Sequence, residues 1–151
     1  MLRLASPSLR LTPFNPSSIA PYTVIALPWK FQDDLYAERK LFVVIGHQNG
    51  FALCLKATSQ TNIYKNNKDA MAGVVFYHAD TLPCFPEDTA IQVDNCVPIP
   101  HSTLIDEKNR LRLEVRQVLA GDFENNLRNA IANSVMLDDR KRTRLNQILG
   151  F

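Results

Sequence analysis

Two polar residues that flank neighbouring apolar runs carry side chains suited to binding a phosphate group. Arg39 comes just before the apolar run 41–46, and Thr58 ends the run 51–58. A guanidinium presents a planar fork of N–H donors that matches phosphate oxygens, and a threonine hydroxyl adds a short donor. The pair therefore predicts a phosphate site if the two runs are neighbouring strands. The alternative is that both residues only end their strands at the solvent.

The turn between these runs decides whether the two side chains meet. Asn49-Gly50 favours a two-residue type I′ hairpin, because both turn positions need positive φ. With unbroken pairing Leu41 faces Thr58, and Arg39 becomes a diagonal neighbour of Thr58, about 7–8 Å away on the same face. A bulge would change this register. The other face is then expected to look toward the core, with Lys40, Phe42, Val44, Leu53, Leu55 and Ala57.

Two further side chains could take part in chemistry or binding. Asp94 ends the predicted strand 89–94, and burial can raise a carboxyl pKa into the range of a general acid or base. Its alternative role is a strand-ending turn with Asn95. Trp29 can stack on unpaired bases, or it can belong to the core or to a dimer interface.

Composition places the chain among single-domain globular proteins. The 151 residues are 46% apolar and 21% charged, which is enough for a sizeable core. A net charge of +2 permits nucleic-acid binding without requiring it. The longest apolar run is too short to cross a membrane, and residues 1–21 lack the apolar stretch of a secretory signal. The three cysteines lack metal-ligand spacing, so we expect reduced thiols in a cytoplasmic protein without metal or cofactor.

The chain divides into an N-terminal arm and one domain. Residues 1–21 hold four prolines and no acid, which is typical of an extended arm without periodic structure. Residues 22–151 form the predicted domain, whose strand signals follow one another without a crossover helix, as in an antiparallel barrel or sandwich. Polar loops are expected at 60–72 and 78–88. Strands are expected at 22–27, 41–47, 51–58, 73–77, 89–94 and 97–104.

Two helices are expected at the C-terminal end, from about residue 122. Asp122 is a candidate N-cap, followed by one apolar stripe of Phe123, Leu127, Ala130 and Ile131. Asp138 or Asp139 is expected to cap a second helix that runs to about 149. The four cations within 140–144 favour a solvated helix face, with an RNA contact as the alternative.

The order of short motifs resembles that of the PemK/MazF-like toxins of bacterial toxin–antitoxin pairs. In that family a strand ends in a Pro-aromatic pair, an Arg-Pro precedes an apolar strand, a Thr-Ser pair closes the next strand, and a later strand ends in an aspartate. The resemblance covers roughly residues 21–120. The matching motifs are VIALPW at 24–29, Arg39 before 41–46, LKATSQ at 55–60 and AIQVDN at 90–95.

This resemblance implies a mainly β (α+β) fold, an SH3-like antiparallel β-barrel with C-terminal helices, usually as a homodimer. It also implies a metal-independent endoribonuclease that cuts single-stranded RNA by attack of the 2′-OH on the adjacent phosphate. The partners implied are single-stranded RNA and a cognate antitoxin protein. The residues matching the catalytic set are Arg39, Thr58 and Asp94. The residues assigned to substrate binding are Ser59, Gln60, Gln92 and Trp29.

The chain departs from the family pattern at two positions near these residues. The Arg-Pro of the family is Arg39-Lys40 here, and Gln92 stands where one branch has a catalytic arginine two residues before the aspartate. The alternative function is therefore a non-catalytic module on the same barrel that binds RNA or a protein partner.

Overall fold

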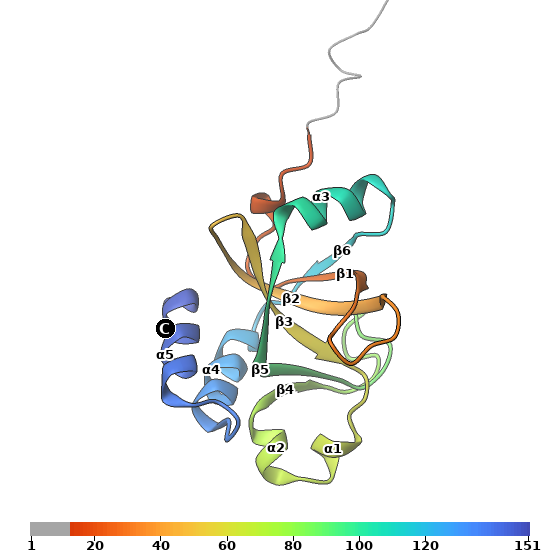
Figure 1. Ribbon diagram of the computed structural model, residues 1–151. Helices are drawn as coiled ribbons and strands as arrows, with labels where there is room; N and C mark the ends of the chain where they lie inside the picture. The colour runs from red at the N-terminus through yellow and green to blue at the C-terminus, as the bar shows by residue number, and fades with distance from the viewer. Residues whose placement is uncertain (1–12) are drawn as a thin grey trace, which may run out of the picture.

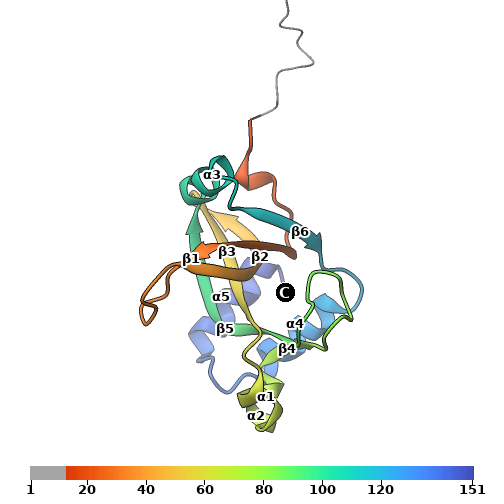
Figure 2. The same ribbon diagram turned by 90° about the vertical axis from the view of Figure 1, so that its right-hand side faces the viewer.

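The computed structural model describes residues 13–151, and its centre is one antiparallel sheet of six strands (Figure 1). The strand order is β4-β5-β3-β2-β1-β6. The sheet is strongly curled, as the turned view in Figure 2 shows. The strands are β1 (Thr23–Trp29), β2 (Glu38–Gln48), β3 (Phe51–Thr58), β4 (Val74–Tyr77), β5 (Thr89–Pro100) and β6 (Glu114–Val118).

The loop between β4 and β5 lies across the open side of the curled sheet. The Cys84 N–H donates to Gln117 Oε1 at 3.2 Å, and Arg116 of the far edge strand β6 donates to the Cys84 carbonyl at 3.0 Å. Phe85, next in this loop, is fully buried. The loop thus joins the two edges of the sheet, and the chain is a mixed α+β protein whose antiparallel sheet forms a half-barrel.

Helices and one 3-10 turn complete the fold. Helices α4 and α5 lie together on one side of the sheet in Figure 1, and α3 lies at the end of β5. None of the helices within residues 13–151 has the length and apolar character needed to cross a bilayer. The elements are η2 (Pro16–Ser18), α1 (Asn62–Lys65), α2 (Lys68–Ala72), α3 (His101–Asn109), α4 (Phe123–Asn133) and α5 (Asp139–Leu149).

Both faces of the sheet are buried, each in its own apolar cluster. We name them the α4–α5 face and the α3 face, after the helices that pack on them. The two faces alternate along β2, because successive side chains of a strand point in opposite directions. The α4–α5 cluster includes Val43, Ile45, Leu53, Leu55, Phe85, Leu127 and Leu145. The α3 cluster includes Ile19, Ile25, Leu27, Phe42, Val44, Cys54 and Leu104.

The predicted tight turn is confirmed. Asn49 and Gly50 have φ values of 53° and 82°, and Gln48 pairs with Phe51. A glycine at the second position accepts this left-handed conformation at little cost. The turn therefore forms as the Asn-Gly signal predicts, with β2 and β3 on either side of it.

The predicted register of this hairpin is wrong beyond the first three pairs. Gly46 pairs with Leu53 and Val44 with Cys54, so Ile45 is an extra residue in β2, a β-bulge. A Cβ on Gly46 would lie 3.3 Å from Ile148 of α5, so Gly46 also faces the α4–α5 side and is closely covered there. Because one extra residue exchanges the faces of everything beyond it, the predicted sets of core and solvent residues are wrong too.

Several predicted elements have different bounds. The expected loop 60–72 contains α1 and α2, and its Asn67 side chain caps α2 by accepting from two backbone N–H groups. The expected strands 89–94 and 97–104 are one strand, β5, which ends at Pro100 because α3 begins at His101. The sequence prediction missed β6, which has an exposed or half-buried pattern throughout. The expected loop 78–88 is confirmed.

The predicted N-terminal arm covers residues 1–21; residues 1–12 lie outside the described part of the chain, and residues 13–21 are irregular apart from the short turn η2. Asn15 caps η2, since its side chain accepts from the Ser17 N–H. Ile19 is buried in the α3 cluster, and Phe14 packs against the same cluster. This segment is therefore part of the domain, because its apolar side chains cover one end of the sheet.

The two C-terminal helices are confirmed. Asp122 precedes α4 but makes no capping hydrogen bond, whereas Asp138 caps α5 by accepting from the Lys141 N–H. Arg142 does not belong to a purely solvated face. Its guanidinium donates to the carbonyls of Ile131, Ser134 and Leu137, and thus ties α5 to the end of α4.

Candidate nucleic-acid interface

Two lysines lie over one aromatic ring at the open end of the α3 face. Lys56 Nζ is 4.4 Å and Lys40 Nζ is 5.9 Å from the centroid of the Phe31 ring. Trp29 lies beside them, since Trp29 and Phe31 both pack on Phe42, with centroid distances of 6.1 and 6.2 Å. We name Trp29, Phe31, Lys40 and Lys56 the lysine–aromatic patch. All four are half-buried and remain partly open to solvent.

Strand pairing explains why these residues gather. Lys40 pairs with Leu27 of β1, and Lys56 pairs with Phe42 of β2. Leu27 and Phe42 belong to the α3 cluster, so both lysines share that face. Trp29 is two residues beyond Leu27 on β1 and therefore points the same way. The apolar ends of β1 and β2 thus supply the support, and the lysine stems cover it.

A short turn after β1 fixes the ring and one of the lysines. The Phe31 N–H donates to Asp34 Oδ2 at 2.9 Å, and Lys40 Nζ lies 3.5 Å from the same oxygen. The hydrogen bond from Phe31 and the charge of Lys40 lower the pKa of Asp34 below its ordinary value. The carboxylate therefore holds Phe31 and Lys40 in place. In contrast, Lys56 makes no ion pair within residues 13–151.

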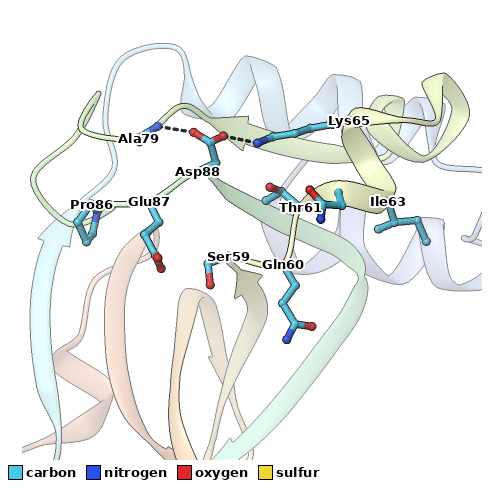
Figure 3. Close-up of a pocket in the computed structure, with 10 residues that line it drawn as sticks. Ser59, Gln60, Thr61, Ile63, Lys65, Ala79, Pro86, Glu87 and Asp88 are labelled. Carbon is cyan, nitrogen blue, oxygen red and sulfur yellow. Dashed lines mark hydrogen bonds and ion pairs between the residues drawn. The ribbon is translucent and has the colours of Figure 1, made fainter.

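Thr58, Ser59 and Gln60 follow directly along β3 and reach an open pocket (Figure 3). The Thr58 hydroxyl accepts from the Gln60 N–H at 3.1 Å, so the chain turns sharply at the end of β3. Ser59 and Gln60 then line a hollow of about 890 Å³ between α1 and the 78–88 loop. Thr58 shares the α3 face with Lys56, which is two residues before it. The strand end thus joins the lysine–aromatic patch to a polar hollow.

The far wall of this pocket is anionic and rigid. Asp88 pairs with Lys65 and accepts from the Ala79 N–H at 2.7 Å, as Figure 3 shows. The hydrogen bond from Lys65, together with that from Ala79, lowers the pKa of Asp88. Asp88 therefore stays ionised at neutral pH and ties α1 to the strand β5. Glu87 points from the same wall toward Ser59 and Gln60 in Figure 3.

Gln92 lies on the same face as Thr58 and links β5 to α1. Its amide donates to the Tyr64 hydroxyl, and its carbonyl accepts from Asn95 at 3.4 Å. Gln92 is two residues beyond Ala90, the partner of Thr58, which places both side chains on one side of the sheet. The amide is therefore held in a fixed position near the end of β3.

Arg39 and Asp94 lie on the opposite, α4–α5 side. Arg39 forms an exposed ion pair with Glu114 of β6, and its side chain lies on the face of Leu41 and Ala57, opposite to that of Thr58. The hydrogen bond from Arg116, and then the charge of Arg39, lower the pKa of Glu114, the partner of Arg39. Asp94 lines a hollow under α5. The structure therefore brings Thr58 and Gln92 to one face and leaves Arg39 and Asp94 on the other.

The sequence prediction missed the roles of Lys40 and Lys56. It places Lys40 on a core face, and it places Lys56 on the same face as Arg39. The missing signal is the bulge at Ile45, which exchanges Arg39 for Lys40 beside Thr58. Once Phe42 is known to pair with Lys56, the alternation of side chains along β2 places Lys40 on the same face as Phe42 and Lys56.

Within residues 13–151, no group of three or more His, Cys, Asp or Glu side chains is arranged to hold a metal ion. The chain matches no protein-family model and no curated protein.

Proposed function

We propose that this chain binds single-stranded RNA on the α3 face of an SH3-like half-barrel. The observation that carries the proposal is the lysine–aromatic patch, in which Lys40 and Lys56 share the Phe31 ring beside Trp29. Single-strand binders combine cations that follow the phosphates with aromatic rings on which bases stack. The patch supplies both at one end of the sheet, from β1, β2 and β3 and the segment after β1.

The chemistry of binding follows from the side chains at the end of β3. The two ammonium groups attract phosphates, and each phosphate that they neutralise releases counterions. The ring of Trp29 can stack a base, an interaction of about 1–3 kcal/mol, while the Phe31 ring holds the two lysines beside it. Ser59 and Gln60 then offer further hydrogen bonds to the RNA at the mouth of the hollow of about 890 Å³, while the carboxylates of Glu87 and Asp88 on its far wall disfavour entry of a phosphate.

Cleavage of the bound RNA is a second proposal, and the PemK/MazF resemblance supports it together with one structural arrangement. The Thr58 hydroxyl shares a face with two cations, Lys40 and Lys56. An ammonium next to a phosphate can stabilise the charge that builds up when a 2′-OH attacks phosphorus. The roles of Arg39 and Asp94 in catalysis, a cognate antitoxin, a homodimer and a cytoplasmic location stay predictions.

The binding test compares neighbouring cations on opposite faces. Fluorescence anisotropy of a labelled single-stranded RNA is measured over a salt series for the wild type, Lys40→Ala/Lys56→Ala and Arg39→Ala. The double variant should lower the salt slope by about 0.7 for each phosphate that is no longer neutralised, whereas Arg39→Ala should leave the slope unchanged. Equal effects of the two variants, or no RNA binding by the wild type, would contradict the proposal.

The cleavage test uses the same RNA and maps its ends. Incubation with pure protein in EDTA should give fragments with a cyclic phosphate and a free 5′-OH, since the proposed reaction uses no metal. Thr58→Ala and Lys56→Ala should each slow cleavage more than they weaken binding, because their interactions with the phosphate strengthen in the transition state. Intact RNA in the presence of bound wild-type protein would leave binding alone as the function.

A further inference from the structure

A groove runs between helix α5 and the sheet, away from the lysine–aromatic patch. One hollow of about 260 Å³ lies between α5 and β5, and a second of about 380 Å³ lies between α5 and the β2–β3 hairpin. Leu53, Arg144 and Ile148 line both hollows. The Arg144 side chain therefore lies between them. We name the two hollows together the α5 groove, and Figure 1 shows α5 beside the hairpin.

The floor of the α5 groove is aliphatic. Leu53, Val93, Leu145 and Ile148 contribute to it, and Leu53 and Leu145 are almost fully buried beneath. The residues that line the 260 Å³ hollow include no aromatic ring. The 260 Å³ hollow thus offers matching apolar surface to aliphatic side chains and no ring for a base to stack on, whereas His47, Gln48 and Gln147 make the 380 Å³ hollow more polar.

The rim of the groove is cationic. Lys141 and Arg144 line it from α5, and neither forms an ion pair with another residue of the described chain, 13–151. Burial raises the pKa of the Cys96 thiol in the groove, while the nearby charge of Arg144 opposes that rise. Asp94 is the acid among the lining residues, and it makes no ion pair with either cation in residues 13–151. Arg142, by contrast, donates to three backbone carbonyls and pairs with Asp139.

We infer that the α5 groove binds an extended, acidic segment of a partner protein that carries aliphatic side chains. The aliphatic side chains would fill the 260 Å³ hollow, and a carboxylate would pair with the Arg144 guanidinium in the bidentate manner. Charge complementarity selects this occupant, because Lys141 and Arg144 make no ion pair within residues 13–151 and stand above an aliphatic floor. The inference is independent of RNA binding on the α3 face.

The test selects ligands without assuming their sequence. A phage-displayed library of random linear peptides is panned against the full chain, and enriched peptides are synthesised with a fluorescent label. The inference expects enriched sequences that combine Asp or Glu with Leu, Ile or Val, and binding that RNA does not displace. No enrichment, or enrichment of basic or aromatic peptides, would overturn it.

Matched charge reversals then locate the site. Arg144→Glu and Lys141→Glu should each weaken binding of the enriched peptide by about tenfold or more, because a like charge replaces the pairing cation. Lys68→Glu makes the same charge change on exposed α2, away from the groove, and should keep the wild-type affinity. If Lys68→Glu weakens binding equally, net charge explains the effect and the groove assignment is wrong. If the α5 variants instead lose RNA and keep the peptide, an RNA contact replaces the inference. Circular dichroism of each variant confirms folding.

Discussion

The two faces of the sheet use their cations differently. On the α3 face, Lys40 and Lys56 lie over an aromatic ring; Lys40 also pairs with Asp34 and Glu38, whereas Lys56 makes no ion pair within residues 13–151. On the α4–α5 side, Arg39 is paired with Glu114 and Arg142 is bound by three carbonyl groups, whereas Lys141 and Arg144 of the α5 groove make no ion pair within residues 13–151. A net charge of +2 hides this difference. The interaction partners of each cation, and not the number of cations, therefore indicate where an anionic ligand can bind.

Removal of the Phe42 ring, which lies beneath the lysine–aromatic patch, should have the largest effect on stability and on RNA binding. Phe42 is fully buried in the α3 cluster and supports Trp29 and Phe31. Phe42→Ala should lower the free energy of unfolding by about 3–5 kcal/mol and also weaken RNA binding, because the patch loses its support. Urea titration and RNA anisotropy measure the two effects.

Leu127→Ala is the matched change on the other face. Leu127 is equally buried, within the α4–α5 cluster. This variant should lose about 2–5 kcal/mol of stability but keep its RNA affinity while folded. The same loss of affinity in both variants would remove the functional difference between the faces.

The next-largest loss of stability is expected on replacing Arg142, the cation that joins α4 to α5. Arg142→Ala leaves the carbonyls of Ile131, Ser134 and Leu137 without their charged donor. The free energy of unfolding should fall by about 1.5–3 kcal/mol, since hydrogen bonds to charged groups are worth that much. Urea titration measures it, with exposed Arg140→Ala as the control. Equal stability of the two variants would show that the hydrogen bonds of Arg142 contribute little.

A histidine pair makes the α3 face the pH-sensitive one. His47 bonds to His101 at 2.8 Å and to the Ile19 carbonyl at 2.8 Å. A carbonyl only accepts, so the His47 Nε2 donates to it, and the second hydrogen bond joins His47 Nδ1 to His101 Nε2. Burial, and then the neighbouring His47, lower the pKa of His101 below its ordinary 6.5.

The sign of the pH effect follows from that shift. The unfolded chain binds the His101 proton at higher pH than the folded chain. The contribution of His101 to the free energy of unfolding is therefore complete above about pH 6.5 and is lost as the pH falls below it. The melting temperature of His101→Gln should therefore depend less on pH between about 5 and 7 than that of the wild type. An unchanged pH dependence in this variant, with exposed His78→Gln as the control, would contradict the assignment.

The smallest effect on the free energy of unfolding is expected from replacing Arg39. Its ion pair with Glu114 is about half exposed on both sides, and exposed pairs contribute about 0–1 kcal/mol. Arg39→Ala should therefore shift the urea midpoint only slightly. A loss of more than about 1 kcal/mol would mean that the edge strand β6 depends on this pair.

Local signals were enough to predict much of the fold. The Asn49-Gly50 turn and the Asp138 cap are set by neighbouring residues, and both form as predicted. The strand β6 escaped prediction because its side chains are mostly exposed, so it has no apolar pattern. The site escaped for a different reason. Both faces of the sheet are apolar, and alternation of hydrophobic residues could not reveal the bulge at Ile45.

The bulge at Ile45 has a consequence for alignment with other chains. A relative that lacks this one residue would present its equivalent of Arg39, and not of Lys40, beside the threonine at the end of β3. In a sequence alignment, one gap placed at Ile45 in β2 therefore decides whether Arg39 or Lys40 is aligned with an arginine of another chain. Equivalence across this strand has to be assigned by the side of the sheet on which a residue lies, and counting from a shared motif gives the wrong partner.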